Sequence, residues 1–447
     1  MSRRPIKDAI IEYDESRPAR FHMPGHKGAL SPFDVTEIGP TDDLQAPSGP
    51  ILKSERLCAE VYSARDAFYL VNGSTTGNLA MMRLIGRGNK VLLDRGCHRS
   101  VIAGAALCGV ETVSIFPDKD GMFTPEQIAA ALDETPCEAV FLTSPTYRGM
   151  TDDIFTIAGA VHKRGALLMV DSAHGAHYPF SDEFPPLPYS ADMYCVSTHK
   201  TLFAMTQSAV LFANDSCPFT RSQIQGAVNM FQSTSPSFEL MMSIEEAVMC
   251  PKSYREHFER LDRFKKALLA VPGASLLGSE NVYLADKTRL NIAVEGMSGR
   301  ALKTVLEKRG IYPEMADGEC VTLITSPYDE DEWYVRTMYA VEAAAAAPKS
   351  PADAQEPDDA IIQGEYCMSL RDAVFSKKGY VRLEDAAGFI AAEPVGVYPP
   401  GVATLFPGER ISAEAVEKLK KLDSRGAELF GAADGMVAVV MEEKTDE

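Results

Sequence analysis

The sequence lacks several features that would place a protein in a specialised class. Its 447 residues contain no run of about 18 apolar residues, so no membrane-spanning helix is expected. No apolar segment follows the early arginines, so no secretory signal is expected. The nine cysteines include no C-x-x-C pair, which argues against a zinc knuckle or a redox dithiol and is typical of reduced thiols. We therefore expect a cytoplasmic protein.

Basic residues are scarce relative to acidic ones. Lysine and arginine number 44 against 63 aspartate and glutamate, which gives a net charge of −19. Because such a surface repels phosphate backbones, we expect no nucleic-acid partner. Most of the charge is expected to serve solubility, although it also agrees with a cationic small molecule as substrate. With 45% hydrophobic residues the composition is that of a globular protein with a sizeable core.

Apolar runs that alternate with helical segments predict the architecture. We expect an N-terminal arm over 1–50, a large domain over 51–275, and a small α+β domain over 276–447 with an exposed linker near 343–360. The apolar runs are 67–71, 90–93, 112–116, 139–142, 166–170, 193–196 and 209–212. Helical segments between the first five predict a mostly parallel sheet covered on both faces. The short connection into the last run predicts an antiparallel strand.

Polar residues follow several of these runs, at the strand ends where parallel sheets bind ligands. After the first run, a glycine turn with Ser74 and Thr75 begins a helix. This pattern suits a phosphate, although an ordinary N-cap shows it too. Asp171 follows the fifth run, where a carboxylate could bind a metal, act as a base or pair with a cationic ring nitrogen. With His174 its spacing is not that of a zinc site, and we predict no metal.

A lysine completes this set of strand-end groups. Lys200 ends the segment Ser197-Thr198-His199-Lys200 after the sixth run, where an amine is suited to form a Schiff base. Taken alone, such a lysine would more simply be a surface residue. A phosphate site, a strand-end carboxylate and an amine are together the groups needed to hold pyridoxal 5'-phosphate. His98, after the second run, would add an aromatic face at this edge or serve as a polar residue at a helix start.

These segments, in this order, resemble one known family. They are Pro24-Gly25-His26-Lys27, Asn72-Gly73-Ser74-Thr75-Thr76-Gly77-Asn78, Cys97-His98-Arg99-Ser100, Ser144-Pro145-Thr146-Tyr147, Asp171-Ser172-Ala173-His174, Ser197-Thr198-His199-Lys200, Thr234-Ser235-Pro236-Ser237 and Tyr398-Pro399-Pro400-Gly401. The chain resembles the short form of the bacterial ornithine/lysine/arginine decarboxylases. The resemblance implies the aspartate-aminotransferase fold (fold type I of the pyridoxal-phosphate enzymes), with a mostly parallel large domain and a smaller α+β C-terminal domain. It also implies a homodimer or a larger homo-oligomer.

The resemblance implies a role for each matching residue. Lys200 would hold the cofactor through a Schiff base, Asp171 would pair with the pyridine nitrogen, and His98 would stack on the ring. The phosphate would be bound by Ser74, Thr75, Ser197 and His199, and His174 would lie beside the ring. The implied reaction is the loss of the α-carboxylate of a basic L-amino acid as carbon dioxide. Lys200 and His98 would set its geometry, and Lys200 or a neighbour would return the proton.

Substrate choice rests on fewer residues. Glu314 and Asp317 are candidates to bind a cationic side chain, although solvated loops often carry such acids. By family habit arginine is the preferred substrate, with lysine or ornithine next, in polyamine synthesis or acid resistance. One alternative is an aminotransferase or aldolase of the same fold, with Arg289 or Arg382 as a carboxylate clamp. Another is a cofactor-binding homologue without catalysis.

Overall fold

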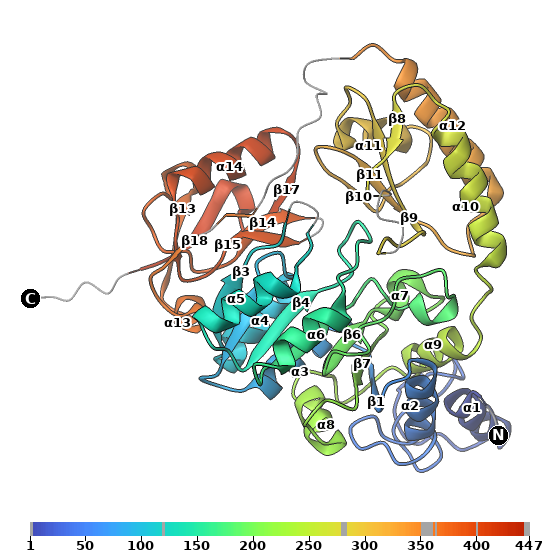
Figure 1. Cartoon of the computed structure of the whole chain (residues 1–447). Coiled ribbons are helices and arrows are strands. Elements are labelled where there is room, and N and C mark those ends of the chain that lie inside the picture. The colour runs from blue at the N-terminus through green and yellow to red at the C-terminus, as the bar shows by residue number, and fades with distance from the viewer. Residues whose placement is uncertain are drawn as a thin grey trace, which may run out of the picture. The chain divides into compact units, whose positions relative to one another are not determined.

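Two compact units make up the computed structural model of the chain, which describes residues 3–118, 121–278, 284–349, 361–362, 364–398 and 401–441 (Figure 1). The first unit comprises Met1–Leu93, Phe123–Pro145 and Asp152–Lys252. The second comprises Asp94–Met122, Thr146–Thr151 and Ser253–Glu447. The domain limits expected from the sequence, at 50 and 275, stay predictions. The predicted exposed linker near 343–360 is wrong at its start, because residues 343–346 end helix α12 (Asp331–Ala346) and Ala344 is buried in it. Residues 350–360 lie outside the described residues.

A mostly parallel sheet forms the centre of the first unit, as the sequence predicts. Its strands within this unit are β1 (Asp66–Leu70), β2 (Lys90–Asp94), β4 (Ala139–Thr143), β5 (Leu167–Asp171), β6 (Met193–Val196) and β7 (Ala209–Ala213), in the order β1-β7-β6-β5-β4-β2. Strands β2, β4, β5 and β6 run parallel, whereas β7 is antiparallel to both of its neighbours, which confirms the predicted last strand. The strands are buried along almost their whole length because helices cover the sheet.

Helices surround this sheet and begin at local sequence signals. They are α2 (Pro50–Val61), α3 (Gly73–Ile85), α5 (Pro125–Glu134), α6 (Ile154–His162), α7 (Thr198–Thr201), α8 (Arg221–Asn229) and α9 (Phe238–Met249). Thr124, Asp153 and Ser237 precede α5, α6 and α9, and each side chain accepts a backbone N–H of the first turn. Helix α3 packs on β6 and β7, and α6 packs on β5. The strand ends therefore lead directly into helix starts.

The N-terminal segment differs from the extended arm expected from the sequence, because it contains helix α1 (Pro5–Glu15). Ile6 and Ile10 lie four residues apart and are buried. The carboxylate of Glu245, on α9, accepts the backbone N–H of Ile6 at 2.9 Å and of Lys7 at 3.0 Å. These amides at the helix start have no partner within the helix. Glu245 therefore supplies the cap that the neighbouring sequence lacks.

The second unit combines small sheets with helices, in agreement with the α+β character predicted for the smaller domain. Its helices are α4 (Arg99–Cys108), α10 (Arg255–Leu268), α11 (Gly299–Glu307), α12 (Asp331–Ala346), α13 (Leu370–Phe375) and α14 (Ala413–Ser424). Its strands are β3 (Glu111–Ile115), β8 (Ala274–Leu276), β9 (Arg289–Val294), β10 (Met315–Ala316), β11 (Val321–Ile324), β12 (Glu365–Tyr366), β13 (Lys378–Arg382), β14 (Val395–Tyr398), β15 (Val402–Leu405), β16 (Glu409–Arg410), β17 (Glu428–Phe430) and β18 (Met436–Val440). One sheet has the order β10-β11-β9-β8 and another the order β15-β14-β17.

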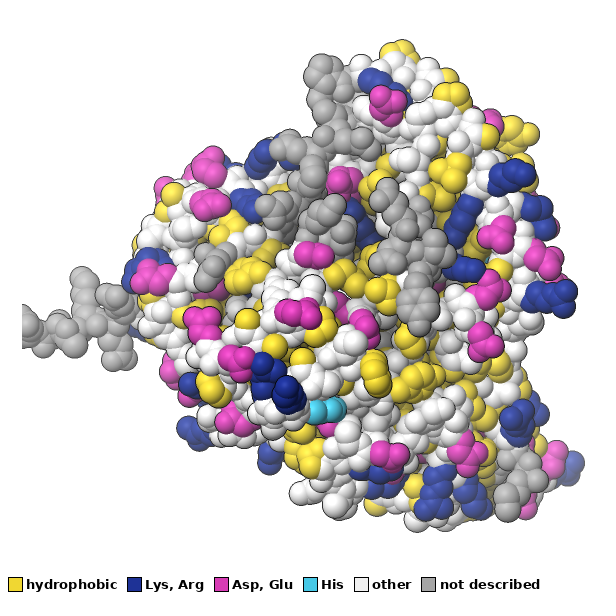
Figure 2. Space-filling model, in the orientation of Figure 1, with side chains coloured by type: hydrophobic (Ala, Val, Ile, Leu, Met, Phe, Trp, Pro, Cys, Tyr) yellow, Lys and Arg dark blue, Asp and Glu magenta, His cyan; other side chains and the backbone are white. Residues whose placement is uncertain are grey.

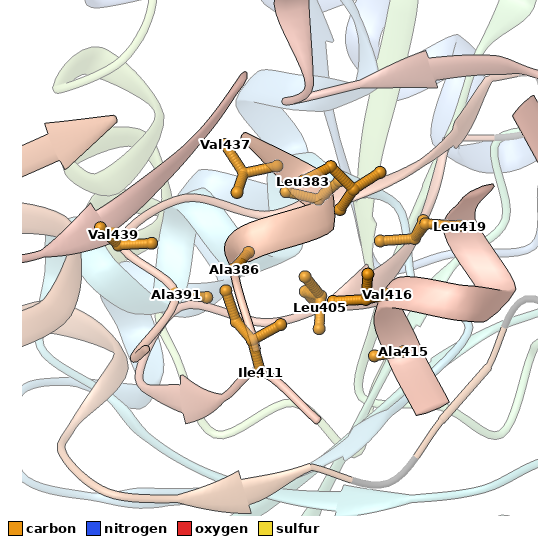
Figure 3. Packing of buried hydrophobic residues seen from close by; sticks show 11 residues of the cluster. Leu383, Ala386, Ala391, Leu405, Ile411, Ala415, Val416, Leu419, Val437 and Val439 are labelled. Carbon is orange, nitrogen blue, oxygen red and sulfur yellow. The ribbon is translucent and has the colours of Figure 1, made fainter. Parts of the chain in front are cut away.

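The C-terminal part of this unit has its own apolar core (Figure 3). Helix α14 contributes Val416 and Leu419, which pack with Leu405 of β15 and Val437 of β18. Leu405, Leu419 and Val437 are each at most 2% exposed. Full burial of a valine or leucine side chain stabilises the folded state by about 1.5–3 kcal/mol, so this core contributes to the stability of the C-terminal part.

A buried ion pair joins two distant segments within the second unit. The Arg95 guanidinium donates to Glu409 at 3.0 Å and to the carbonyl oxygens of Ala403 and Thr404 at 2.9 Å each. It also lies over the Phe406 ring, 3.5 Å from the centroid. Because both charged groups are almost fully buried, their mutual contact offsets the loss of hydration.

Charged side chains of both signs are intermingled on the face of the molecule drawn in Figure 2. Among the described residues, no helix is both long and apolar enough to cross a membrane.

Candidate active site

A glycine turn and two hydroxyl groups meet at the start of α3. Gly73 has a φ of +75°, which favours glycine, and it opens the helix directly after β1. The Ser197 hydroxyl, after β6, donates to the Ser74 hydroxyl at 2.9 Å. Thr75 lies exposed in the same first turn. The free backbone N–H groups of a helix start, beside two hydroxyls, form a site suited to an anion such as a phosphate.

Asp171 ends β5 as a buried carboxylate that is only 4% exposed. One oxygen accepts the Asn78 side-chain N–H at 2.7 Å, and the other accepts the backbone N–H of Ala173 at 3.1 Å. No lysine or arginine of the described chain forms an ion pair with it. A buried charge without a counter-ion is costly, so this environment favours a cationic group of a ligand.

Lys200 lies in α7, directly after β6 and half-buried. Its amine is 3.2 Å from Nε2 of His174, which is itself 5% exposed. His199, which precedes Lys200 in the sequence, donates its Nδ1–H to the carbonyl oxygen of Ser208 at 2.8 Å. Burial lowers the pKa of the His199 ring, and the nearby Lys200 charge lowers it further. The first unit thus brings together Ser74, Asp171, His174, Ser197, His199 and Lys200.

His98 belongs to the second unit, where it caps helix α4. Its Nδ1 accepts the backbone N–H of Ser100 at 3.2 Å and lies 2.8 Å from the Ser100 hydroxyl. A side chain at Gly401 would lie 3.4 Å from Cδ2 of the His98 ring. The alternative role considered above, a polar residue at a helix start, is therefore present. Stacking of His98 on a cofactor stays a prediction.

The two acids predicted to bind a substrate have partners within the second unit. Glu314 accepts the Tyr147 hydroxyl at 2.6 Å. Asp317 accepts from the Arg148 guanidinium at 2.6 Å, and Glu319 accepts from the same group at 2.9 Å. Asp317 therefore already has a cation beside it, whereas Glu314 has a neutral hydroxyl. Their role toward a substrate stays a prediction.

The two arginines considered as carboxylate clamps differ in environment. Arg289 is buried, and its guanidinium lies 3.6 Å from the carboxylate of Asp286. Arg382 is largely exposed, and it lies 3.6 Å from Glu384. Each guanidinium lies beside a carboxylate of its own chain. Neither geometry therefore favours a clamp for a substrate carboxylate, which an aminotransferase would need.

Three residues beside Asp171 were missed as site residues by the sequence analysis. Asn78 binds Asp171, and the thiol of Cys195 lies 3.1 Å from the Asn78 side-chain oxygen. A side chain at Gly77 would lie 2.8 Å from Cβ of Cys195, so glycine lets α3 approach β6 closely. The signal available was the spacing of Asn78, four residues after Ser74, on the helix face that carries Ser74.

Comparison with known proteins decides the family. The pattern of the Orn/Lys/Arg decarboxylase major domain matches residues 4–268, and that of the C-terminal domain of the same family matches residues 363–444. The chain belongs to the Orn/Lys/Arg decarboxylase family. As a member of the Orn/Lys/Arg decarboxylases it is an amino-acid decarboxylase, which confirms the resemblance noted in the sequence.

Several relatives of this Orn/Lys/Arg decarboxylase extend over the full chain. The uncharacterised protein YaaO of Bacillus subtilis is 32% identical and matches 96% of both chains. An arginine decarboxylase of the same organism is 28% identical and matches 98% of both. The solved structure of the constitutive lysine decarboxylase of Escherichia coli aligns with a TM-score of 0.81 at 19% identity, over 98% of this chain and 82% of that one. The last comparison shows the fold.

Proposed function

We propose that this chain is a pyridoxal-phosphate-dependent decarboxylase that converts a basic L-amino acid into the corresponding amine and carbon dioxide, with arginine preferred and lysine or ornithine next. The observation that carries the proposal is the buried Asp171 carboxylate, which accepts two hydrogen bonds and forms no ion pair with a lysine or arginine of the described chain. A protonated pyridine nitrogen supplies the missing charge. The similarity to an arginine decarboxylase at 28% identity favours arginine.

The residues on the first unit fit the parts of this cofactor. Ser74 and Ser197 supply hydroxyls, and the start of α3 supplies N–H groups, for phosphate oxygens. Asp171 holds a proton at the ring nitrogen. Lys200 supplies the amine that attaches the cofactor, and His174 holds that amine 3.2 Å away. We propose that Thr75 and His199 add contacts to the phosphate and that His98 stacks on the ring.

When bound, pyridoxal phosphate supplies the electron sink for the electron pair that the departing carbon dioxide leaves behind. The chain's residues prepare this step. Asp171 would hold a proton at the ring nitrogen, and this would strengthen the electron-withdrawing character of the ring. Lys200, held by His174, is placed to return a proton to the α-carbon once carbon dioxide has left.

For the cationic end of the substrate we propose Glu314. Asp317 already pairs with Arg148, so an added cation would have to share or displace it. Glu314→Gln is expected to raise KM for arginine about ten- to a hundredfold, the range for a hydrogen bond to a charged group, with kcat nearly unchanged. Steady-state kinetics checks this, with Glu319→Gln as the matched control. An unchanged KM in Glu314→Gln would contradict the assignment.

The proposal as a whole is tested by incubating the purified holoenzyme separately with arginine, lysine and ornithine. We expect carbon dioxide and amine in equal amounts, with the highest kcat/KM for arginine. Lys200→Ala is the control and is expected to lose both the visible absorption of the cofactor and product formation. Accumulation of a keto acid instead would identify an aminotransferase, and a coloured but inert protein would identify a non-catalytic homologue.

We further propose that the protein acts in the cytoplasm as a homodimer or larger homo-oligomer, in polyamine synthesis or acid resistance. All nine cysteines are free thiols, which supports a reducing compartment. Light scattering on the purified holoenzyme measures its mass, and a monomer at working concentration would contradict the dimer.

A further inference from the structure

A buried chain of hydrogen bonds lies behind Asp171. The Asn78 amide donates to Asp171 at 2.7 Å, and the Cys195 thiol lies 3.1 Å from the Asn78 oxygen. Asn78 and Cys195 are fully buried, and Asp171 is 4% exposed. In such a site hydrogen bonds are stronger than in water, and a misplaced polar atom is costly. The three side chains come from α3, β5 and β6, so the chain of bonds is set by the packing of the fold.

The Cys195 thiol decides which way the Asn78 amide faces. Burial raises the pKa of this thiol well above its usual range, and the Asp171 charge raises it further, so it stays protonated. A protonated thiol donates, and its nearest acceptor is the Asn78 amide oxygen at 3.1 Å, whereas the Ser74 carbonyl oxygen and one Asp171 oxygen are each 3.9 Å away. This leaves the NH2 group for Asp171. The opposite orientation would set the amide oxygen against a carboxylate oxygen, with no proton between them.

We propose that Asn78, oriented by Cys195, is a positioning residue that holds the Asp171 carboxylate directed for the pyridine nitrogen of the cofactor. This inference rests on the proposed function. With one oxygen held by Asn78 and the other by the Ala173 N–H, the carboxylate plane is fixed before the cofactor binds. Asn78 acts through Asp171, and the proton on the ring nitrogen depends on it indirectly.

The test compares two ligands that differ at one ring atom. Pyridoxal phosphate and its analogue with CH in place of the ring nitrogen are titrated into the wild-type protein and Asn78→Leu, which has similar size without polar atoms. Asn78→Leu is expected to weaken the binding of pyridoxal phosphate about ten- to a hundredfold. The binding of the analogue should weaken less than about twofold. An equal loss for both ligands would mean that Asn78 serves packing only and would overturn the inference, as would no loss for either.

Two variants of the thiol keep the test valid if Asn78→Leu folds poorly. Cys195→Ser retains a donor and is expected to keep most of the affinity for pyridoxal phosphate, whereas Cys195→Ala removes the donor and is expected to lose affinity for that ligand alone. Equal behaviour of the two would count against the role of Cys195. The ring nitrogen of the bound cofactor should lose its proton at a lower pH in Cys195→Ala, which nitrogen-15 NMR of the labelled cofactor measures.

The wild-type titration separates failure of this inference from failure of the proposed function. A wild-type protein that does not bind pyridoxal phosphate would overturn the proposed function itself. A wild-type protein that binds it, with Asn78→Leu unchanged, would overturn only the role of Asn78.

Discussion

Arg95 and Asp171 are both buried and charged, but only Arg95 has an oppositely charged partner in the described chain. Arg95 has an acid, two carbonyl oxygens and an aromatic face of its own chain around it. Asp171 has donors but no cation among the described residues. The same cost of removing a charge from water applies to both. Arg95 therefore serves the stability of the second unit, whereas for Asp171 we propose that the charge arrives with a ligand.

The Arg95 pair yields a prediction about stability. Arg95→Met is expected to lower the free energy of unfolding of the second unit by about 3–5 kcal/mol, because it leaves Glu409 buried and unpaired. Adding Glu409→Gln should restore part of the loss. Urea denaturation of the single and double variants measures both values. Lys378→Met, at the partly exposed pair with Glu393, is the control and should cost about 1 kcal/mol or less. Equal costs for Arg95→Met and Lys378→Met would contradict the account.

At the scale of single residues, the sequence predicted the position of those side chains that directly follow an apolar run. The positions of Asp171 at the end of β5 and of Lys200 just after β6 were predictable, because polar residues that end buried apolar runs lie at one edge of a parallel sheet. Their roles stay predictions. The partners of Glu314 and Asp317 were not found, because Tyr147 and Arg148 lie 167 and 169 positions away along the chain. Such contacts depend on tertiary packing, which no local pattern contains.

At the scale of elements, the approach of α3 to β6 brings Asn78 to Asp171. Helix α3 and β6 touch at Gly77, where a side chain would lie 2.8 Å from Cβ of Cys195 and 3.2 Å from Leu70. The strands β1 to β7 lie close to the apolar runs of the sequence, so they were predictable. The distance between α3 and β6 could not be predicted, because it depends on the absence of a Cβ atom at Gly77. Helix α1 was missed for a related reason, since Glu245 caps it from 239 positions away.

Gly77→Ala tests the close approach of α3. The added methyl group should force α3 away from β6, lower the free energy of unfolding by about 1–3 kcal/mol and weaken binding of pyridoxal phosphate. Gly159→Ala on α6 is the matched control. Nothing lies within 4 Å of a side chain there, so it should be neutral or stabilise slightly, by up to about 1 kcal/mol. Thermal unfolding and cofactor titration measure both variants, and identical behaviour of the two would contradict the packing argument.

At the scale of the whole molecule, family membership and the strand-end groups lead to one activity. The chain belongs to the Orn/Lys/Arg decarboxylases, and its first unit brings together the groups that suit pyridoxal phosphate. The net charge of −19 agrees with a cationic substrate without deciding it. We propose that substrate preference depends on a few side chains such as Glu314, and sequence similarity alone leaves three basic amino acids as candidate substrates.

The central claim is tested most directly by following the carboxyl carbon of the substrate. Purified holoenzyme is incubated with arginine labelled at the α-carboxylate, and in parallel with lysine and ornithine labelled in the same way. We expect the label to leave as carbon dioxide in step with an equal amount of the amine, and we expect Lys200→Ala to release none. Label retained in a keto acid, or no release from any of the three amino acids, would contradict it.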